Sequence, residues 1–399
     1  MTRGSSLALV ALLVFTMGTS IITPLIPLYQ QGYGLSNGVL MLLFATYTAT
    51  VVPTMLLAGN ASDRLGRKRL AVPAMLVMTT ASLVFAFTQS VPLLFAGRVL
   101  QGLAIGMFLG VGTAFVIDHA RPGAKALAAM TAGAAFRLGF GLGPLFAGIV
   151  AQYWGNPLNR PFQVHVVLMV VGIACVLVAR ETVPRRPYRF EMRVGVPTGQ
   201  GRGFAGFIGP AVFTMSFMEG TVLSIVPLFL YDTLGATNVA IAGLCGFLVL
   251  GIGGMTPIVT RNLDPRKAVM VGVAVSAAVT WLIAGAALAA SATLVVVAAG
   301  ILGFVNGMIL QGGTVICGTI VPLEERGKLM SSLYMCAYAG TIPTVGLGYL
   351  SQAVGLTTAL MVFSTIACVL AVWIVLVGRR LFPHVIPYVE PVTVSSPVA

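Results

Sequence analysis

A charged stretch, Gly59-Asn60-Ala61-Ser62-Asp63-Arg64-Leu65-Gly66-Arg67-Lys68-Arg69, separates two long apolar runs of the chain. Its two glycines allow a tight turn and a close approach between helices. Its acid stands beside a run of basic residues, which can pair with carboxylates, and an acid can also sit at the positive end of a neighbouring helix. The stretch therefore indicates a short loop between two apolar helices, and the rest of the sequence decides what surrounds them.

The composition is that of a membrane protein. Of 399 residues, 58% are apolar and 8% are charged, against roughly 25% charged in an ordinary soluble domain. The 23 basic and 10 acidic side chains could not cover the surface of a soluble protein of this size. This argues against a soluble enzyme, a disordered chain or a nucleic-acid binder, and for a chain that crosses a bilayer many times.

Runs of about 20 apolar residues, the length that spans a bilayer as a helix, can be counted directly. We expect twelve spans, and so an all-α membrane protein. They lie near residues 6–29, 38–59, 70–88, 93–117, 127–151, 164–180, 204–230, 238–260, 267–288, 294–320, 329–351 and 358–378.

The basic residues predict the orientation of these spans. Twenty of the 23 Lys and Arg residues lie at the two ends of the chain or in the even-numbered connections, and Arg160 alone lies in an odd-numbered one. Arg98 and Arg137 lie inside spans. Because cytoplasmic loops carry the excess of Lys and Arg, we expect both termini to be cytoplasmic. The same asymmetry explains the net charge of +13 without a polyanionic partner such as nucleic acid.

The chain divides into two halves of six spans. We expect an N-terminal bundle at 1–180, a cytoplasmic linker at 181–203, a C-terminal bundle at 204–380 and a disordered cytoplasmic tail at 381–399. The halves resemble each other, since Val-Phe-Thr-Met occurs in the first span and again 198 residues later in the seventh. Parallel repeats of this kind are typical of transporters whose halves rock about a site at the middle of the membrane.

The loop at 59–69 resembles the G-x-x-x-D-R-x-G-R-[KR]-x signature of the major facilitator superfamily. The resemblance implies twelve transmembrane helices in two pseudo-symmetric six-helix bundles around a central cavity. It also implies that the loop acts as a gate on the cytoplasmic side, with an acid at the end of span 4 and a matching loop after span 10 as partners. The gating residues that it implies are Gly59, Asp63, Arg64, Gly66, Arg67, Asp118, Glu324 and Arg326.

Two further motifs carry the resemblance. Arg98, with Gly102 four residues later, is similar to the family's R-x-x-x-G motif in span 4. A buried arginine costs at least about 2.5–3.5 kcal/mol, so Arg98 must find partners or reach the outer interface. In span 5, residues 139–148 resemble the antiporter motif G-x-x-x-G-P-x-x-G-G, with Ala147 in place of one glycine. The motif residues Gly139, Gly143, Pro144 and Gly148 imply export by exchange.

Two charges lie at membrane depth, Glu219 in span 7 and Arg137 in span 5. Burial favours the neutral form of a carboxyl, so a membrane-depth acid can load and release protons. Span 1 has no acid and span 10 offers only Asn306 and Gln311. Glu219 is therefore our candidate for proton coupling, and the alternative is a structural Glu219–Arg137 pair.

The sequence predicts a secondary active transporter, not an enzyme: a proton-coupled exporter of small amphiphilic compounds or drugs. It has no phosphate-binding G-x-x-x-x-G-K-[ST] loop, and we expect no cofactor, no metal and a monomer in a cell membrane of the bacterial inner-membrane type. The expected substrate contacts are Phe15, Arg98, Gln101, Arg137, Asn306, Gln311, Tyr334 and Tyr338. The alternatives are an exporter of an anionic metabolite, such as a siderophore or an acidic lipid precursor, and a membrane receptor that transports nothing.

Overall fold

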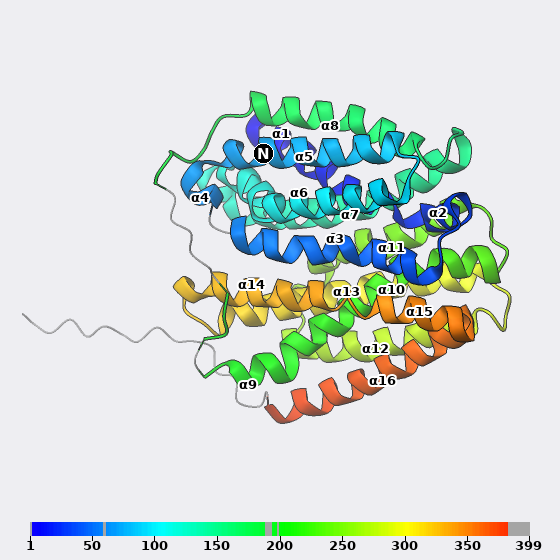
Figure 1. Cartoon of the computed structure of the whole chain (residues 1–399). Helices are drawn as coiled ribbons and strands as arrows, with labels where there is room; N and C mark the ends of the chain where they lie inside the picture. The colour runs from blue at the N-terminus through cyan, green and yellow to red at the C-terminus, as the bar shows by residue number, and fades with distance from the viewer. Residues whose placement is uncertain (1, 59–60, 188–193, 198, 382–399) are drawn as a thin grey trace, which may run out of the picture.

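A computed structural model describes residues 2–58, 61–187, 194–197 and 199–381, and every regular element in them is helical (Figure 1). The first half contains α1 (Arg3–Ser20), η1 (Thr23–Leu25), α2 (Ile26–Tyr33), α3 (Asn37–Ala58), α4 (Ala61–Leu65), α5 (Arg67–Phe87), α6 (Val91–Asp118), η2 (Pro122–Ala124), α7 (Lys125–Tyr153) and α8 (Arg160–Val178). The second half contains α9 (Gly201–Gly203), η3 (Phe204–Ile208), α10 (Gly209–Leu228), η4 (Phe229–Thr233), α11 (Val239–Thr260), α12 (Pro265–Gly285), α13 (Ala292–Thr319), α14 (Leu323–Ala339), α15 (Thr344–Val354) and α16 (Leu356–Leu381). The predicted tail, apart from Leu381, lies outside the described residues.

Eleven helical stretches among the described residues are long and apolar enough to cross a membrane. Helices suit this medium because each satisfies its own backbone hydrogen bonds where water is absent. The remaining predicted span, 329–351, consists of two shorter helices, α14 and α15, with a break at 340–343. Pro343 cannot donate a backbone hydrogen bond there, and a Cβ at Gly340 would lie 2.2 Å from the carbonyl oxygen of Phe213 on α10. The predicted all-α fold is confirmed, with one crossing made by a broken helix.

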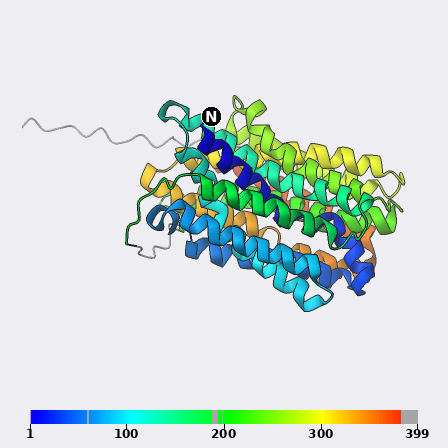
Figure 2. The ribbon, with the colours of Figure 1, turned by 90° about the horizontal axis from the view of Figure 1, so that it is seen from above.

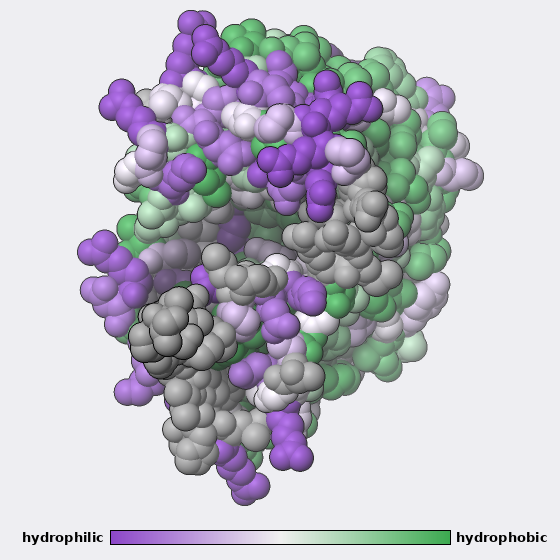
Figure 3. All heavy atoms as spheres, turned by 90° about the vertical axis from the view of Figure 1, so that its left-hand side faces the viewer, coloured by the Kyte–Doolittle hydropathy of each residue, from purple (hydrophilic) through white to green (hydrophobic). Residues whose placement is uncertain are grey.

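The helices form two groups in Figure 1, α1–α8 above and α9–α16 mostly below, with α11 at the level of α3 where the groups meet. Figure 2 shows them running along a common long axis. One end of the molecule, which we call the basic end, carries Arg67, Arg121, Arg180, Arg261 and Lys328. Hydrophilic side chains gather there in Figure 3. The opposite end is called the far end below.

The two groups of helices close on each other at the far end. The side-chain amide of Asn37 on α3 donates to the hydroxyl of Ser351 on α15 over 3.0 Å. A Cβ at Gly348 on α15 would lie 2.3 Å from Cγ of Met41 on α3, so the backbone of α15 packs directly against the Met41 side chain. Ile21, Leu25 and neighbouring residues of the first group share one buried apolar core with α10 and α11.

The most extensive crossing between the groups is that of α7 with α11, and there the two backbones meet directly. A Cβ at Gly141 on α7 would lie 2.6 Å from the backbone nitrogen of Gly251, and one at Gly243 on α11 would lie 2.5 Å from the carbonyl of Pro144. Small residues allow such backbone-to-backbone packing in membranes, where van der Waals contact drives helix association. This crossing fixes one wall of the space between the two groups.

Candidate functional site

A cavity of about 670 Å³ lies between the two groups of helices. Its lining reaches the basic end through Ser62 on α4, Met130 on α7 and Ile258 on α11, and Figure 3 shows the recess at that end. Toward the middle of the molecule the lining includes Phe44 and Thr341. Because the groups close on each other at the far end, the cavity is accessible from the basic end.

Arg137 on α7 and Glu219 on α10 are the charged residues among those that line the cavity in the described part of the chain. Nη2 of Arg137 lies 3.3 Å from Oε2 of Glu219, and both side chains are about one-sixth exposed, at 17% and 16%. The ion pair thus joins the two groups of helices inside the cavity. Sequence reasoning placed both charges at membrane depth and left their pairing open, and the structure brings them together.

Glycines of α11 make room for Arg137. A Cβ at Gly253 would lie 3.0 Å from Nη2 of Arg137, and one at Gly254 would lie 2.9 Å from its Cβ. The arginine is therefore wedged between α11 and the cavity. The sequence shows this glycine pair plainly, but without the fold nothing links it to an arginine more than a hundred residues away.

Three more of the expected substrate contacts line the cavity, Gln311 on α13 and Tyr334 and Tyr338 on α14. Oε1 of Gln311 accepts a hydrogen bond from the hydroxyl of Thr260, which orients the amide. The other lining residues are mainly apolar, with methionines from both groups of helices and phenylalanines from the first group. Flexible, polarisable methionine side chains adapt to ligands of different shape.

Four expected contacts lie outside the cavity lining: Phe15, Arg98, Gln101 and Asn306. Phe15 is fully buried and stacks on Phe108 with ring centroids 3.9 Å apart. The side-chain oxygen of Asn306 lies 3.3 Å from the hydroxyl of Ser276 on α12, in the packing between α12 and α13. In this structure each of the four side chains faces a neighbouring helix, and none lines the cavity.

Arg98 is 1% exposed and does not reach the outer interface. Its guanidinium donates to the carbonyls of Leu43, Phe44 and Thr19 and to the side chain of Gln101, at 2.9–3.3 Å. Gln101 donates in turn to the carbonyl of Gly18 over 2.8 Å. Arg98 therefore braces α1, α3 and α6 within one group, because its fixed fork of donors satisfies several carbonyls at once.

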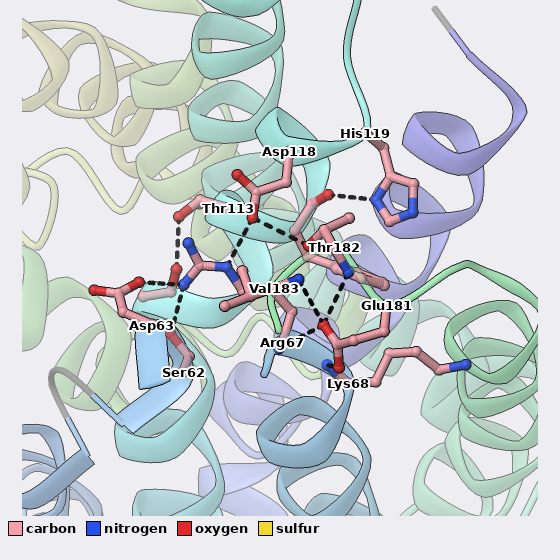
Figure 4. A network of polar contacts seen from close by, with 12 residues as sticks. Ser62, Asp63, Arg67, Lys68, Thr113, Asp118, His119, Glu181, Thr182 and Val183 are labelled. Atoms are coloured by element: carbon pink, nitrogen blue, oxygen red, sulfur yellow. Dashed lines mark hydrogen bonds and ion pairs between the residues drawn. The ribbon is translucent and has the colours of Figure 1, made fainter. Parts of the chain in front are cut away.

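At the basic end, the sequence motif forms a compact ionic cluster (Figure 4). Nε of Arg67, at the start of α5, lies 2.8 Å from Oδ2 of Asp118 at the end of α6. The same guanidinium pairs with Asp63 on α4 and donates to the hydroxyl of Ser62 over 2.7 Å. Charge-assisted bonds to two acids hold α4, α5 and α6 together, and this cluster is intact while the cavity is accessible from the basic end.

Sequence reasoning missed Glu181, just after α8. Its carboxylate accepts hydrogen bonds from the backbone nitrogens of Arg67 and Lys68 at 2.9 and 3.0 Å, and so caps the start of α5. It also accepts from the backbone nitrogens of Thr182 and Val183 (Figure 4). The start of the linker is thereby attached to the motif loop. The available signal was one acid in a basic connection directly after a predicted span.

The remaining predicted gating residues are placed as follows. Gly66 has φ +110°, a conformation that favours glycine. The backbone carbonyl of Arg64 accepts from the backbone nitrogen of Arg186 over 2.7 Å. Arg326 is exposed on α14. Gly59 lies outside the described residues, as does the side chain of Glu324.

The antiporter motif of α7 contacts two partners. A Cβ at Gly139 would lie 1.9 Å from the hydroxyl of Thr16, and one at Gly143 would lie 2.4 Å from the carbonyl of Met17, both on α1. A Cβ at Gly148 would instead lie 2.9 Å from the carbonyl of Val239 at the start of α11. The motif thus packs α7 against its own group and across to the other group.

Within the described residues, no three His, Cys, Asp or Glu side chains are grouped so that they could hold a metal ion. The five cysteines are unpaired thiols.

Comparison with known proteins places this geometry in a family. The profile described as "Major Facilitator Superfamily" matches residues 8–261. Multidrug resistance protein 1 of Bacillus subtilis (strain 168) is 27% identical over 268 residues, which are 64% of this chain and 65% of that protein. A triacylglyceride transporter of Mycolicibacterium smegmatis (strain ATCC 700084 / mc(2)155) is 35% identical over 155 residues, 38% of this chain and 27% of that protein. The chain therefore spans less than two thirds of each of these relatives.

Among solved structures, a POT family transporter in complex with 5-aminolevulinic acid superposes with a TM-score of 0.76. The superposition covers 95% of this chain and 97% of that one at 12% sequence identity, so the likeness concerns the fold.

Proposed function

Because the chain belongs to the major facilitator superfamily, we propose that it is a proton-coupled exporter of small amphiphilic compounds, drugs among them. The basic end faces the cytoplasm in this proposal, since Lys and Arg concentrate there. Both termini are then cytoplasmic and the cavity is accessible from inside the cell. The protein acts as a monomer in the bacterial inner membrane, and residues 1–180 and 204–380 are the two bundles that rock around the cavity.

The observation that carries this proposal is the cavity with one opposite-charge pair in an otherwise uncharged lining. Methionine and aromatic side chains suit amphiphilic compounds of varied shape. Glu219 is the one acid that such compounds meet in the described lining. The proposal assigns proton coupling to Glu219 because its carboxyl group lies on the cavity that the substrate enters.

One proton per substrate is enough to drive export. A proton that moves inward through ~100 mV releases about 2.3 kcal/mol, and one pH unit adds about 1.4 kcal/mol. The total of about 3.7 kcal/mol sustains roughly a 500-fold gradient of a neutral substrate. In this proposal one coupling carboxyl, Glu219, is enough for that stoichiometry.

The ionic cluster at the basic end supplies the gate. Ser62 of the cluster and Ser331 on α14 both line the cavity, so closing this end brings α4 toward α14. The Arg67 contacts keep α4 in one position relative to α5 and α6. We infer that the cluster presents a preformed surface to α14 when the cavity closes to the cytoplasm.

The test uses proteoliposomes that hold a pH-sensitive dye and an imposed pH gradient. Ethidium and N-propyl dansylamide serve as a cationic and a neutral amphiphile. An antiporter moves protons down their gradient only when a transported compound is present, and it concentrates that compound. Binding without movement of protons or compound would identify a receptor and refute the proposal.

A second candidate is export of an anionic metabolite or lipid precursor. The match to a triacylglyceride transporter supports the lipid-like part of this candidate and not its charge, because a triacylglyceride is uncharged. The positive charge that an anion needs is reduced, however, because Arg98 is buried within one group of helices and Arg137 is paired with Glu219. Export of an anionic lipid but not of ethidium or N-propyl dansylamide in the same assay would favour this candidate.

A further inference from the structure

The Arg137–Glu219 contact leaves much of the bonding capacity of both groups unused. Among the described residues, Arg137 makes one hydrogen bond, from Nη2 to Oε2 of Glu219 at 3.3 Å. Its Nε is buried and has no hydrogen-bond partner there. A guanidinium carries five N–H donors, and ion pairs of full strength lie at about 2.7–2.9 Å. The contact is therefore long and single, inside a cavity large enough for a ligand.

The charges of the lining add up to zero. Arg137 and Glu219 are opposite in sign, and the other lining residues among those described carry no charge. A ligand with a net positive charge that binds Glu219 leaves Arg137 without its counter-ion at membrane depth. A ligand with a net negative charge that binds Arg137 leaves Glu219 in the same condition. Removing one partner of a buried pair is costly because the other charge stays desolvated and unpaired.

We propose that the cavity selects zwitterionic amphiphiles, which insert between Arg137 and Glu219 and give each of them a new partner of opposite charge. The cationic group of the ligand takes the carboxylate of Glu219, and its anionic group takes the N–H donors of Arg137 on the cavity side. Neither protein charge is then left alone. The apolar part of the ligand lies against the methionine and aromatic lining. This inference rests on the proposed role of the cavity as the substrate site.

The positions of both charges support such an exchange. Gly253 on α11 lies against Nη2 and Nε of Arg137. The Arg137 side chain is 17% exposed and lines the cavity, so a ligand reaches its guanidinium from the cavity side. Glu219 is on α10, and Gly220 beside it also lines the cavity. The ligand would therefore contact α7 of the first group and α10 of the second. Its two charges would replace the direct Arg137–Glu219 ion pair that joins these helices.

The test is equilibrium binding of four dansyl amides that share one fluorophore and differ in their tails. The tails are a propyl sulfobetaine (zwitterion), a propyl trimethylammonium (cation), a propane sulfonate (anion) and a plain propyl group (neutral). These charges do not titrate, so pH changes the protein alone. The full chain is purified in the uncharged detergent dodecyl maltoside, and Kd is read from dansyl fluorescence without any proton gradient.

We expect the wild-type chain to bind the sulfobetaine about tenfold or more tightly than the cation or the anion. Arg137→Gln should change the preferred probe to the cation, and Glu219→Gln should change it to the anion. The double variant should bind the neutral probe at least as well as the charged ones. Arg160→Gln at the start of α8 and Asp232→Asn in η4 are matched changes away from the cavity, and both should keep the wild-type order.

The proposal is overturned if the wild-type chain binds the cation, the anion or the neutral probe as tightly as the sulfobetaine. It is equally overturned if both single variants fold and keep the wild-type order of affinities. Because the wild-type comparison alone decides the first point, poor folding of a variant does not prevent a decision. Proton-driven transport is measured separately in proteoliposomes. A chain that exports amphiphiles without preferring the sulfobetaine would refute this inference alone, and a chain that prefers the sulfobetaine but moves no protons would refute the proposed coupling alone.

Discussion

The crossing of α7 and α11 gives a prediction whose size follows from the coordinates. A Cβ at Gly141 would lie 2.6 Å from the nitrogen and 2.7 Å from Cα of Gly251, well inside ordinary carbon contact at about 3.5–4.0 Å. Both atoms belong to the backbone, so no side-chain rotation relieves the clash. Gly141→Ala should therefore cost about 1–3 kcal/mol as overpacking, less the roughly 0.5–1 kcal/mol that alanine gains over glycine in a helix.

Gly300→Ala is the matched control, since Gly300 lies inside helix α13 and a Cβ there meets nothing within 4 Å. The assay is thermal unfolding of the two purified variants in the same detergent. We expect Gly300→Ala to melt at or slightly above wild type. Gly141→Ala should melt about 1–4 °C below Gly300→Ala, because both variants gain the same helix propensity and only Gly141→Ala is overpacked. If both variants melt at the same temperature, the tight packing of α7 on α11 is not what holds this crossing together.

Three more predictions concern Arg98, Glu181 and the ionic cluster at the basic end. Arg98→Lys should lower the thermal stability, because a lysine cannot satisfy every acceptor that the guanidinium reaches and each unsatisfied buried group costs about 1–3 kcal/mol. Unchanged stability with altered substrate preference would contradict the proposed role of Arg98 in holding α1, α3 and α6 together. Glu181→Gln should weaken the cap of α5 and speed trypsin cleavage after Arg185, as measured by a time course on gels. An unchanged cleavage rate would show that Glu181 does not hold the start of the linker against the motif loop. Asp63→Asn should increase labelling, from the cytoplasmic side, of a cysteine introduced in place of Ser331, while substrate affinity in detergent stays within a few-fold. Unchanged labelling with normal transport would contradict a gating role for Asp63.

The sequence predicts the fold well because the bilayer imposes a simple rule. A helix must be long and apolar enough to cross, and hydropathy records both properties. The break in the eleventh span was not predicted, because hydropathy averaged over the whole run hides the sequence Gly340-Thr341-Ile342-Pro343, in which glycine and proline favour the end of a helix. The break combines the missing backbone donor of Pro343 with the close passage of Gly340 over the backbone of α10.

The site is only partly readable from the sequence, because hydropathy gives the depth of a charge and not the direction it faces. Arg137 and Glu219 both face the cavity, whereas Arg98, also an intramembrane arginine, faces the carbonyls of α1 and α3. The partners of Arg98 are backbone groups, which no side-chain pattern reveals. Glu181 was missed for a similar reason, since its main partners are backbone nitrogens at the start of another helix.

The central claim is that Glu219 couples proton entry to substrate export. The most direct measurement compares uphill and downhill flux of one transported amphiphile in proteoliposomes that hold wild type, Glu219→Gln or, as a control, Asp232→Asn. Glutamine imitates a permanently protonated Glu219, so the account predicts that Glu219→Gln loses uphill, pH-driven export and keeps downhill exchange, while the control behaves as wild type. Uphill export by Glu219→Gln with the wild-type pH dependence would contradict the account, and coupling would then have to pass through Asp118 or another ion.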